Sequence, residues 1–242
     1  NALAGYDAND PCSFPSERQD YTEMIGLDVK GMVVGVPTNY YFDGVDPQVE
    51  LHVQNALGKF EELGARIEPV TFPNVERLIA AQQMVIRCEA YAVHEPILRE
   101  HGDKYDPEIK ERLLSAQNEP AYLYIQAAQV KSEAIKEFGA VLNKVDVIVT
   151  PTMPILPPDM GEREVQFMGQ KTNIRPALTR LAGLTNFNGF PSLSIPCGFS
   201  ADGLPIGLQM IGKPWDEAGL YRFAYALEQA LALPNLKMGI MS

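Results

Sequence analysis

The chain is poor in cysteine and histidine, and this shortage excludes several classes of protein. Its 242 residues include 3 cysteines and 3 histidines. The cysteines match no Cys-x-x-Cys or zinc-ribbon spacing, and the histidines form no His-Glu-x-x-His motif, so the sequence predicts neither a disulfide framework nor a metal site. A reducing cytoplasm is the simplest location for such a chain.

Long apolar runs are also missing. No stretch approaches the roughly 18 apolar residues of a membrane-spanning helix. The N-terminus has no basic segment followed by an apolar one, so it does not read as a signal peptide. The first residue is Asn1 and not methionine, which indicates a chain that begins within a longer sequence.

Positive charge is scarce as well. With 20 Lys and Arg against 31 Asp and Glu, the net charge is −11. This charge repels phosphate backbones and anionic lipids, so nucleic acid and membrane surfaces are poor direct partners. Gly-x-Gly-x-x-Gly and phosphate-loop patterns are absent too, so we expect no cofactor. The 46% of hydrophobic residues indicates a globular domain.

What is present begins with a βαβ pattern. Residues 31–37 form a short apolar run bounded by glycine and proline, which is typical of a buried strand. Asp46 and Pro47 then provide a helix cap and a first-turn proline, and apolar residues follow at helical spacing up to Gly64. Residues 65–70 are strand-like again. A strand, a helix and a strand in about 40 residues predict a parallel sheet.

The remaining elements alternate between helix and strand, after a polar connector at residues 1–26. A helical segment at 74–143 divides into helices at about 74–100, 107–117 and 120–143, because proline or glycine interrupts the pattern. A buried strand at 146–150 precedes a proline-rich stretch at 151–174, which we interpret as a long loop. A helix at 175–184, strands at 192–197 and 205–212, and a helix at 216–232 complete the prediction.

The sequence offers only weak candidates for a catalytic nucleophile. Ser192 and Ser194 alternate along a predicted strand and lie in no Gly-x-Ser-x-Gly turn, so hydroxyls bonded to the protein are the better interpretation. Cys197 has no histidine near it in the sequence, and we interpret it as a buried structural thiol.

One segment is much more specific. Thr185 to Phe199 reads Thr-Asn-Phe-Asn-Gly-Phe-Pro-Ser-Leu-Ser-Ile-Pro-Cys-Gly-Phe, and a second block follows from Gly203 to Glu217. Together they resemble the C-terminal signature of the amidase signature family. Residues 1–11, 30–37 and 145–151 resemble further family segments, in the family's order. The resemblance implies an α/β fold with a mixed, largely parallel sheet flanked by layers of helices.

The resemblance also exposes an absence. The family's chemistry uses a lysine and two serines, one after a cis peptide, in a glycine- and serine-rich front half. Nothing in residues 1–242 matches that segment. The chain therefore resembles the C-terminal portion of an amidase signature domain, with 1–26 as the connector from a missing N-terminal half, and it carries none of the catalytic residues. Without that half, apolar surface should be exposed.

By position, this portion supplies one wall of the substrate pocket. The resemblance assigns substrate-binding roles to Thr179, Arg180, Thr185 and Asn186, with the loop from Thr152 to Pro158 beside them. For Arg180 a solvated helix charge is the alternative.

Three functions remain open. The leading one is hydrolysis of a small non-peptide amide, because Thr179 replaces an acidic residue that would suit glutamine in the A component of the glutamyl-tRNA amidotransferase. That amidotransferase component is the second, and a catalytically silent binding or scaffold remnant is the third. The partners implied are the amide, the missing front half and, as a further option, a second copy in a homo-oligomer.

Overall fold

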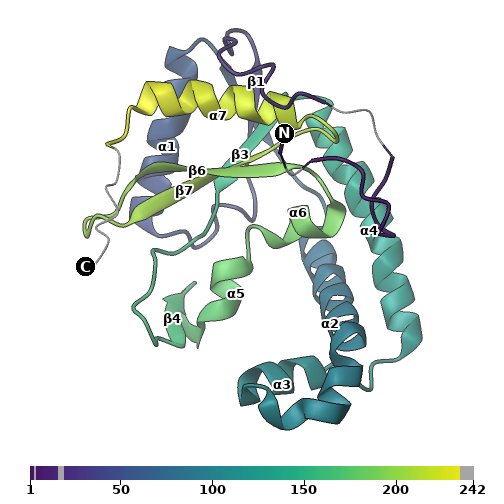
Figure 1. Ribbon diagram of the computed structural model, residues 1–242. Helices are drawn as coiled ribbons and strands as arrows, with labels where there is room; N and C mark the ends of the chain where they lie inside the picture. The colour runs from purple at the N-terminus through teal and green to yellow at the C-terminus, as the bar shows by residue number, and fades with distance from the viewer. Residues whose placement is uncertain (3, 16–18, 235–242) are drawn as a thin grey trace.

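A five-stranded sheet in the order β2-β1-β3-β7-β6 forms the centre of the molecule (Figure 1). The computed structural model describes residues 1–2, 4–15 and 19–234. The strands of this sheet are β1 (Val33–Pro37), β2 (Arg66–Val70), β3 (Val147–Pro151), β6 (Ser192–Phe199) and β7 (Pro205–Ile211).

The predicted βαβ unit is confirmed. β1 and β2 pair in parallel, and α1 (Pro47–Glu62) connects them. The Asp46 side chain accepts a hydrogen bond of 2.8 Å from the backbone N–H of Gln48, and Pro47 occupies the first turn, as the sequence indicated. Gly64 then turns the chain at a φ of +84°, a conformation that favours glycine.

The strand directions confirm the mixed sheet. β1 is parallel to β3, whereas β7 is antiparallel to both β3 and β6. Consequently β2, β1, β3 and β6 point the same way and β7 alone is reversed. The β6–β7 hairpin forms one edge of the sheet, and β7 lies next to β3, the last of the three adjacent parallel strands β2, β1 and β3.

Helices cover both faces of the sheet. On one face α1 and α7 (Glu217–Leu231) pack on residues such as Val147 and Val149, and the rings of Phe60 and Phe223 lie 6.0 Å apart. On the other face, Ile148 and Ile211 belong to a second core formed with α2 (Val75–His101), α4 (Ala121–Leu142) and α6 (Gly183–Asn188). Side chains that alternate along β3 therefore enter different cores.

The predicted helical segment at 74–143 is present, with all three helices near their expected positions. α2 and α4 pack against each other and extend away from the sheet, and α3 (Pro107–Leu114) lies at their far end (Figure 1). A short 3-10 turn, Gly102–Lys104, joins α2 to α3. We call α2, α3 and α4 the helical arm.

Two predictions were wrong. The stretch at 151–174 is not a loop throughout, because it contains the hairpin of β4 (Glu164–Phe167) and β5 (Gln170–Asn173). Met168 and Gly169 at its turn both have positive φ, of 50° and 77°, as a two-residue hairpin turn requires. Residues 164–167 do alternate between exposed and half-buried side chains, but this strand is only four residues long and lies within a proline-rich stretch.

The second error concerns the helix at 175–184, which is divided into α5 (Ile174–Thr179) and α6. The reason is tertiary. The carbonyl of Arg180 accepts a hydrogen bond of 2.7 Å from the hydroxyl of Tyr40, so a side chain distant in sequence occupies a carbonyl beside the break.

The predicted connector at 1–26 contains turns but no helix or strand among its described residues. Residues 3 and 16–18 lie outside the described part of the chain.

Candidate functional site

Asp146 brings together the segments that sequence analysis singled out. Its carboxylate accepts a hydrogen bond of 2.8 Å from the backbone N–H of Val33, and its other oxygen lies 3.3 Å from Lys213 Nζ. Asp146 directly precedes β3, so its carboxylate joins β3 to the start of β1 and to Lys213, which follows β7. These interactions fix the ends of the strands opposite to the end where Thr152 and the cavity lie.

A row of polar side chains crosses the sheet on the face of α2, α4 and α6. Thr150, Gln209 and Ser194 are paired in register on β3, β7 and β6. Gln209 Nε2 donates to Thr150 Oγ1 at 3.2 Å and to the carbonyl of Leu181 at 3.5 Å. Thr150 and Gln209 are buried, whereas Ser194 is exposed. The row therefore links the sheet interior to the turn between α5 and α6.

The hydroxyls of Thr152 and Ser194 lie 2.6 Å apart at the end of this row. Gly207 permits this approach, because a Cβ there would stand 2.9 Å from Thr152 Oγ1 and 3.1 Å from Ser194 Oγ. A mainly apolar cavity of about 210 Å³ adjoins the pair, lined by residues that include Leu156 and Pro196. The 152–158 loop predicted as a pocket wall contributes residues 152, 153 and 155–157 to that lining.

Arg180 is held in the structure and is not simply a solvated charge. Its guanidinium carbon lies 4.1 Å from the ring centre of Tyr40 and 5.7 Å from that of Phe167, and Nη1 donates to the carbonyl of Asp43 at 3.1 Å. Cation–π contacts of this kind fix a guanidinium in place. Arg180 remains partly exposed, so one part of it still faces solvent.

Tyr40 is itself unusual. Its φ is 66°, which is strained for an aromatic residue, and its backbone N–H donates to the Asp43 carboxylate at 3.0 Å. Burial raises the pKa of Tyr40 to about 12, although the positive charge of Arg180 acts in the opposite direction. The phenol therefore stays protonated and keeps donating to the carbonyl of Arg180.

The other predicted site residues lie nearby in the chain but in different environments. The hydroxyl of Thr179 donates to the carbonyl of Arg175 at 3.1 Å, and Thr179 is exposed. Thr185 is buried in α6, donates to the carbonyl of Ala182 at 3.0 Å and contacts Ser192 Oγ at 3.5 Å. Asn186 is exposed on the same helix.

Sequence reasoning missed Tyr40 and Phe167, which hold Arg180. A usable signal was present for Tyr40, since three consecutive aromatic residues at 40–42 follow soon after the end of a predicted parallel strand. Binding residues gather at such strand ends. Phe167 had no comparable signal, because its hairpin was not predicted.

The candidate nucleophiles have no basic partner in the described part of the chain. Among the described side chains, the hydroxyls of Ser192 and Ser194 form hydrogen bonds only with the hydroxyls of Thr185 and Thr152. Burial raises the pKa of the Cys197 thiol to about 12, so it is not a thiolate near neutral pH. Activation of an alcohol requires an adjacent base or another activating group, and none lies within hydrogen-bonding distance of these hydroxyls among the described residues.

The described residues contain neither a metal centre nor a membrane span. Among residues 1–2, 4–15 and 19–234, no three histidine, cysteine, aspartate or glutamate side chains gather as metal ligands would. In the same part of the chain, no helix has the length and hydropathy needed to cross a bilayer.

Comparison with known proteins defines the class. A family model described as Amidase matches residues 1–221. An Amidase of Pseudomonas putida is 35% identical over 94% of this chain and 49% of its own length. The A component of the glutamyl-tRNA(Gln) amidotransferase of Thermodesulfovibrio yellowstonii is 33% identical over 98% of this chain and 53% of its own length. This chain therefore belongs to the amidase signature family, whose members are hydrolytic amidases and their relatives.

A solved structure supports the same fold. A chain described in work on a vestigial protein complex and the origins of an s-triazine catabolic enzyme superposes with a TM-score of 0.88 and 26% identity. The superposition covers 98% of this chain and 51% of the other. The present chain thus spans about half the length of the curated relatives and of the solved chain that it matches.

Proposed function

We propose that this chain forms the sheet and one pocket wall of an amidase that hydrolyses a small non-peptide amide, while the attacking serine and its lysine base belong to a separate, complementary segment. The observation that carries the proposal is the row from Thr150 to Ser194. It ends in exposed hydroxyls beside an apolar cavity, and no base from the described residues accompanies it.

The surface of the molecule supports a complementary segment. The accessible surface is 14844 Å² for a mass of 26.7 kDa. A compact monomer of that mass exposes about 10,700 Å². The excess of about 4,000 Å² is on one chain alone and exceeds the roughly 1,000 to 2,500 Å² per partner that permanent interfaces bury; the connector at 1–26, most of whose described residues are exposed, accounts for part of it. Apolar side chains on α2 contribute to it, since Val93 and Ile86 are 71% and 55% exposed.

The open edge of β6 supports the same proposal. β6 pairs with β7 along one side, and no other described strand pairs with its second side. An eight-residue edge with exposed Ser192, Ser194 and Pro196 can accept a further strand. A strand added there would bring its own residues next to the Thr152–Ser194 pair.

The polar groups near the site favour an uncharged ligand of modest size. Thr179 provides a hydroxyl where an acid would be needed to hold an ammonium group. The apolar lining of the adjacent cavity suits the acyl part of an amide. The proposal places the protein in the cytoplasm, where this chain and its complementary segment act as one unit or as several copies in a homo-oligomer.

The test is isolation of the native protein, followed by intact-mass measurement and ammonia release from simple amides. A mass or a second polypeptide that includes a glycine- and serine-rich segment, with hydrolysis of benzamide or propionamide, supports the proposal. A lone, folded 242-residue species without activity supports the silent scaffold instead. Ammonia release from glutamine that depends on added partner proteins supports the amidotransferase alternative.

A further inference from the structure

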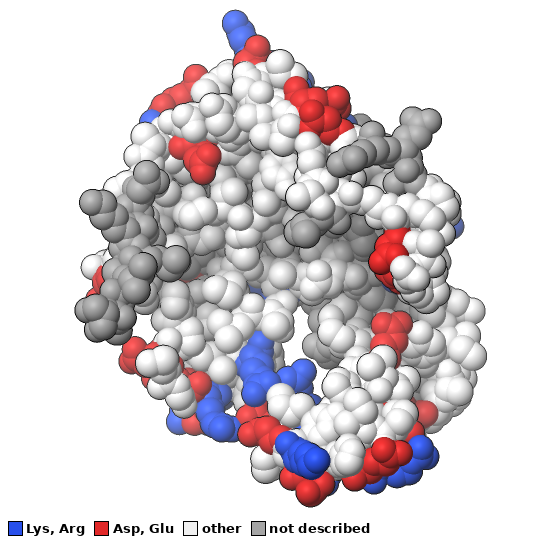
Figure 2. Space-filling model, in the orientation of Figure 1, with Lys and Arg blue, Asp and Glu red and all other residues white. Residues whose placement is uncertain are grey.

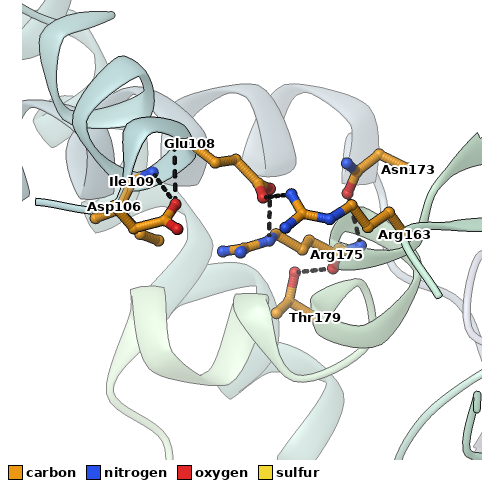
Figure 3. Close-up of polar contacts among 7 residues, drawn as sticks. All are labelled: Asp106, Glu108, Ile109, Arg163, Asn173, Arg175 and Thr179. Carbon is orange, nitrogen blue, oxygen red and sulfur yellow. Dashed lines mark hydrogen bonds and ion pairs between the residues drawn. The ribbon is translucent and has the colours of Figure 1, made fainter. Parts of the chain in front are cut away.

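Glu108 joins two arginines that are distant from it in sequence. Its Oε2 accepts a hydrogen bond of 2.6 Å from Arg163 Nη1, and its Oε1 lies 2.9 Å from Arg175 Nε. Figure 3 shows the carboxylate pointing between the two guanidinium groups. Each oxygen therefore has its own cationic donor, and we call this arrangement the Glu108 bridge.

The start of α3 places Glu108 for this role. The Asp106 carboxylate accepts hydrogen bonds from the backbone N–H groups of Glu108 at 3.0 Å and Ile109 at 3.4 Å. A carboxylate in the first turn is also favoured by the helix dipole. The Glu108 side chain is 28% exposed, against 74% for Arg163, so the carboxylate is the least solvated member of the bridge.

The two arginines flank one small unit. Arg163 precedes β4, and its carbonyl accepts a hydrogen bond of 3.0 Å from the N–H of Ile174. Arg175 lies in the first turn of α5, where the Asn173 side chain accepts a hydrogen bond of 2.9 Å from its backbone N–H. The unit packs around a small core of Ile174 and Ala177, which Ile155 from the preceding loop completes. The Glu108 bridge thus fastens this hairpin unit, residues 163–180, to the helical arm.

The bridge closes a ring around a hollow. The sheet and α6, then α2, α3 and the hairpin unit follow one another around it (Figure 1). Figure 2 shows a hollow in the same region, with Lys and Arg atoms at its edge. Thr179 and Arg180 follow Arg175 on α5, and the Thr179 hydroxyl bonds the Arg175 carbonyl at 3.1 Å. A movement of Arg175 would therefore displace Thr179 directly and would strain the contacts that hold Arg180 to Tyr40 and Asp43.

We propose that Glu108 is a positioning residue that clamps the hairpin unit to the helical arm and so limits the size of the amide that reaches Thr179 and Arg180. This assignment rests on the proposed function for its substrate, but not for its mechanical part. Because the arginines are well exposed, the bridge is weak enough to open and close. Opening widens the ring without unfolding either core.

The mechanical part is tested by hydrogen exchange in the complete protein. In Glu108→Ala, amide protection across 163–180 falls by about fivefold, as expected when two partly exposed ion pairs, each of modest strength, are lost from a local opening equilibrium. Glu108→Gln, which keeps an acceptor but no charge, gives an intermediate value. Glu111→Ala removes an exposed glutamate one turn further along α3 and leaves this protection unchanged.

The specificity part is tested by kinetics on two amides that differ only in bulk, such as propionamide and a branched or aryl analogue. In Glu108→Ala the kcat/KM ratio of bulky to small amide rises by about fivefold, mainly through KM, and Glu111→Ala leaves it unchanged. Added salt, which screens the pairs, raises the ratio in the parent and not in Glu108→Ala.

Each outcome has a definite consequence. Unchanged exchange in Glu108→Ala overturns the clamp. Faster exchange with an unchanged size ratio overturns the role in specificity. If no amide is hydrolysed by the parent, the proposed function fails, and the exchange data alone decide whether the clamp exists. Should Glu108→Ala fold poorly, the double variant Arg163→Ala/Arg175→Ala breaks both pairs of the bridge from the other side and must reproduce the faster exchange.

Discussion

The contact between Arg180 and Tyr40 gives a prediction that separates a structural role from a solvated charge. Two interactions join these residues, and different substitutions remove them. The guanidinium lies over the ring at 4.1 Å, and the phenol hydroxyl bonds the Arg180 main-chain carbonyl at 2.7 Å. Arg180→Ala removes the first interaction, Tyr40→Phe removes the second, and Tyr40→Leu removes both.

The magnitudes follow from these distances and from partial burial. A cation–π contact that is partly desolvated contributes about 1 to 2 kcal/mol, and Arg180→Ala also removes the exposed hydrogen bond to the Asp43 carbonyl, so it should lower the free energy of unfolding by at least that amount. Loss of a single hydrogen bond in Tyr40→Phe costs about 1 kcal/mol. Because Arg180→Ala and Tyr40→Phe remove different interactions, their effects should add to within about 0.5 kcal/mol. Arg180→Ala and Tyr40→Leu share the ring contact, so they should be coupled by about 1 kcal/mol.

Equilibrium unfolding in urea, followed by circular dichroism, measures these differences. With a urea dependence of about 2.5 kcal/mol per M, a loss of about 1 kcal/mol lowers the midpoint by about 0.4 M. Arg99→Ala is the matched control, because Arg99 is 68% exposed and its partner Glu95 lies 3.6 Å away. That substitution should cost less than about 0.5 kcal/mol. If Arg180→Ala costs no more than the control and shows no coupling to Tyr40→Leu, the guanidinium is a solvated charge and our reasoning is wrong.

Four further predictions concern packing and ionisation. A Cβ at position 198 would stand 2.6 Å from Cε1 of His52, so Gly198→Ala should destabilise the fold by about 1 to 3 kcal/mol, and His52→Ala in the same chain should recover most of the loss in urea unfolding. Phe138 is fully buried among aromatic rings, so Phe138→Ala should cost about 3 to 5 kcal/mol, and a loss below about 1 kcal/mol would contradict the described core. Thiol reagents at about pH 8 should modify exposed Cys12 quickly and Cys197 only on unfolding. Because burial raises the Cys197 pKa from 9.0 to about 12, the stability that this group contributes is complete below about pH 9 and is lost between pH 9 and 12, which unfolding at stepped alkaline pH can follow.

The sequence by itself determined most of the elements, because their signals are local. Asp46 and Pro47 start α1, and Gly64 turns the chain after it, through caps and backbone preferences that operate within a few residues. The apolar runs of β1 and β3 predicted buried strands for the same reason. The family resemblance added the mixed sheet and the functional class, since its segments are specific and occur in order.

Tertiary structure decided the site. The division between α5 and α6 depends on Tyr40, which is 140 residues from Arg180 and bonds its carbonyl. The Glu108 bridge likewise depends on arginines 55 and 67 residues away, and on a hairpin within a proline-rich stretch. No pattern within a short window can report such pairings, because they arise only when the sheet and the helical arm have placed these side chains within bonding distance.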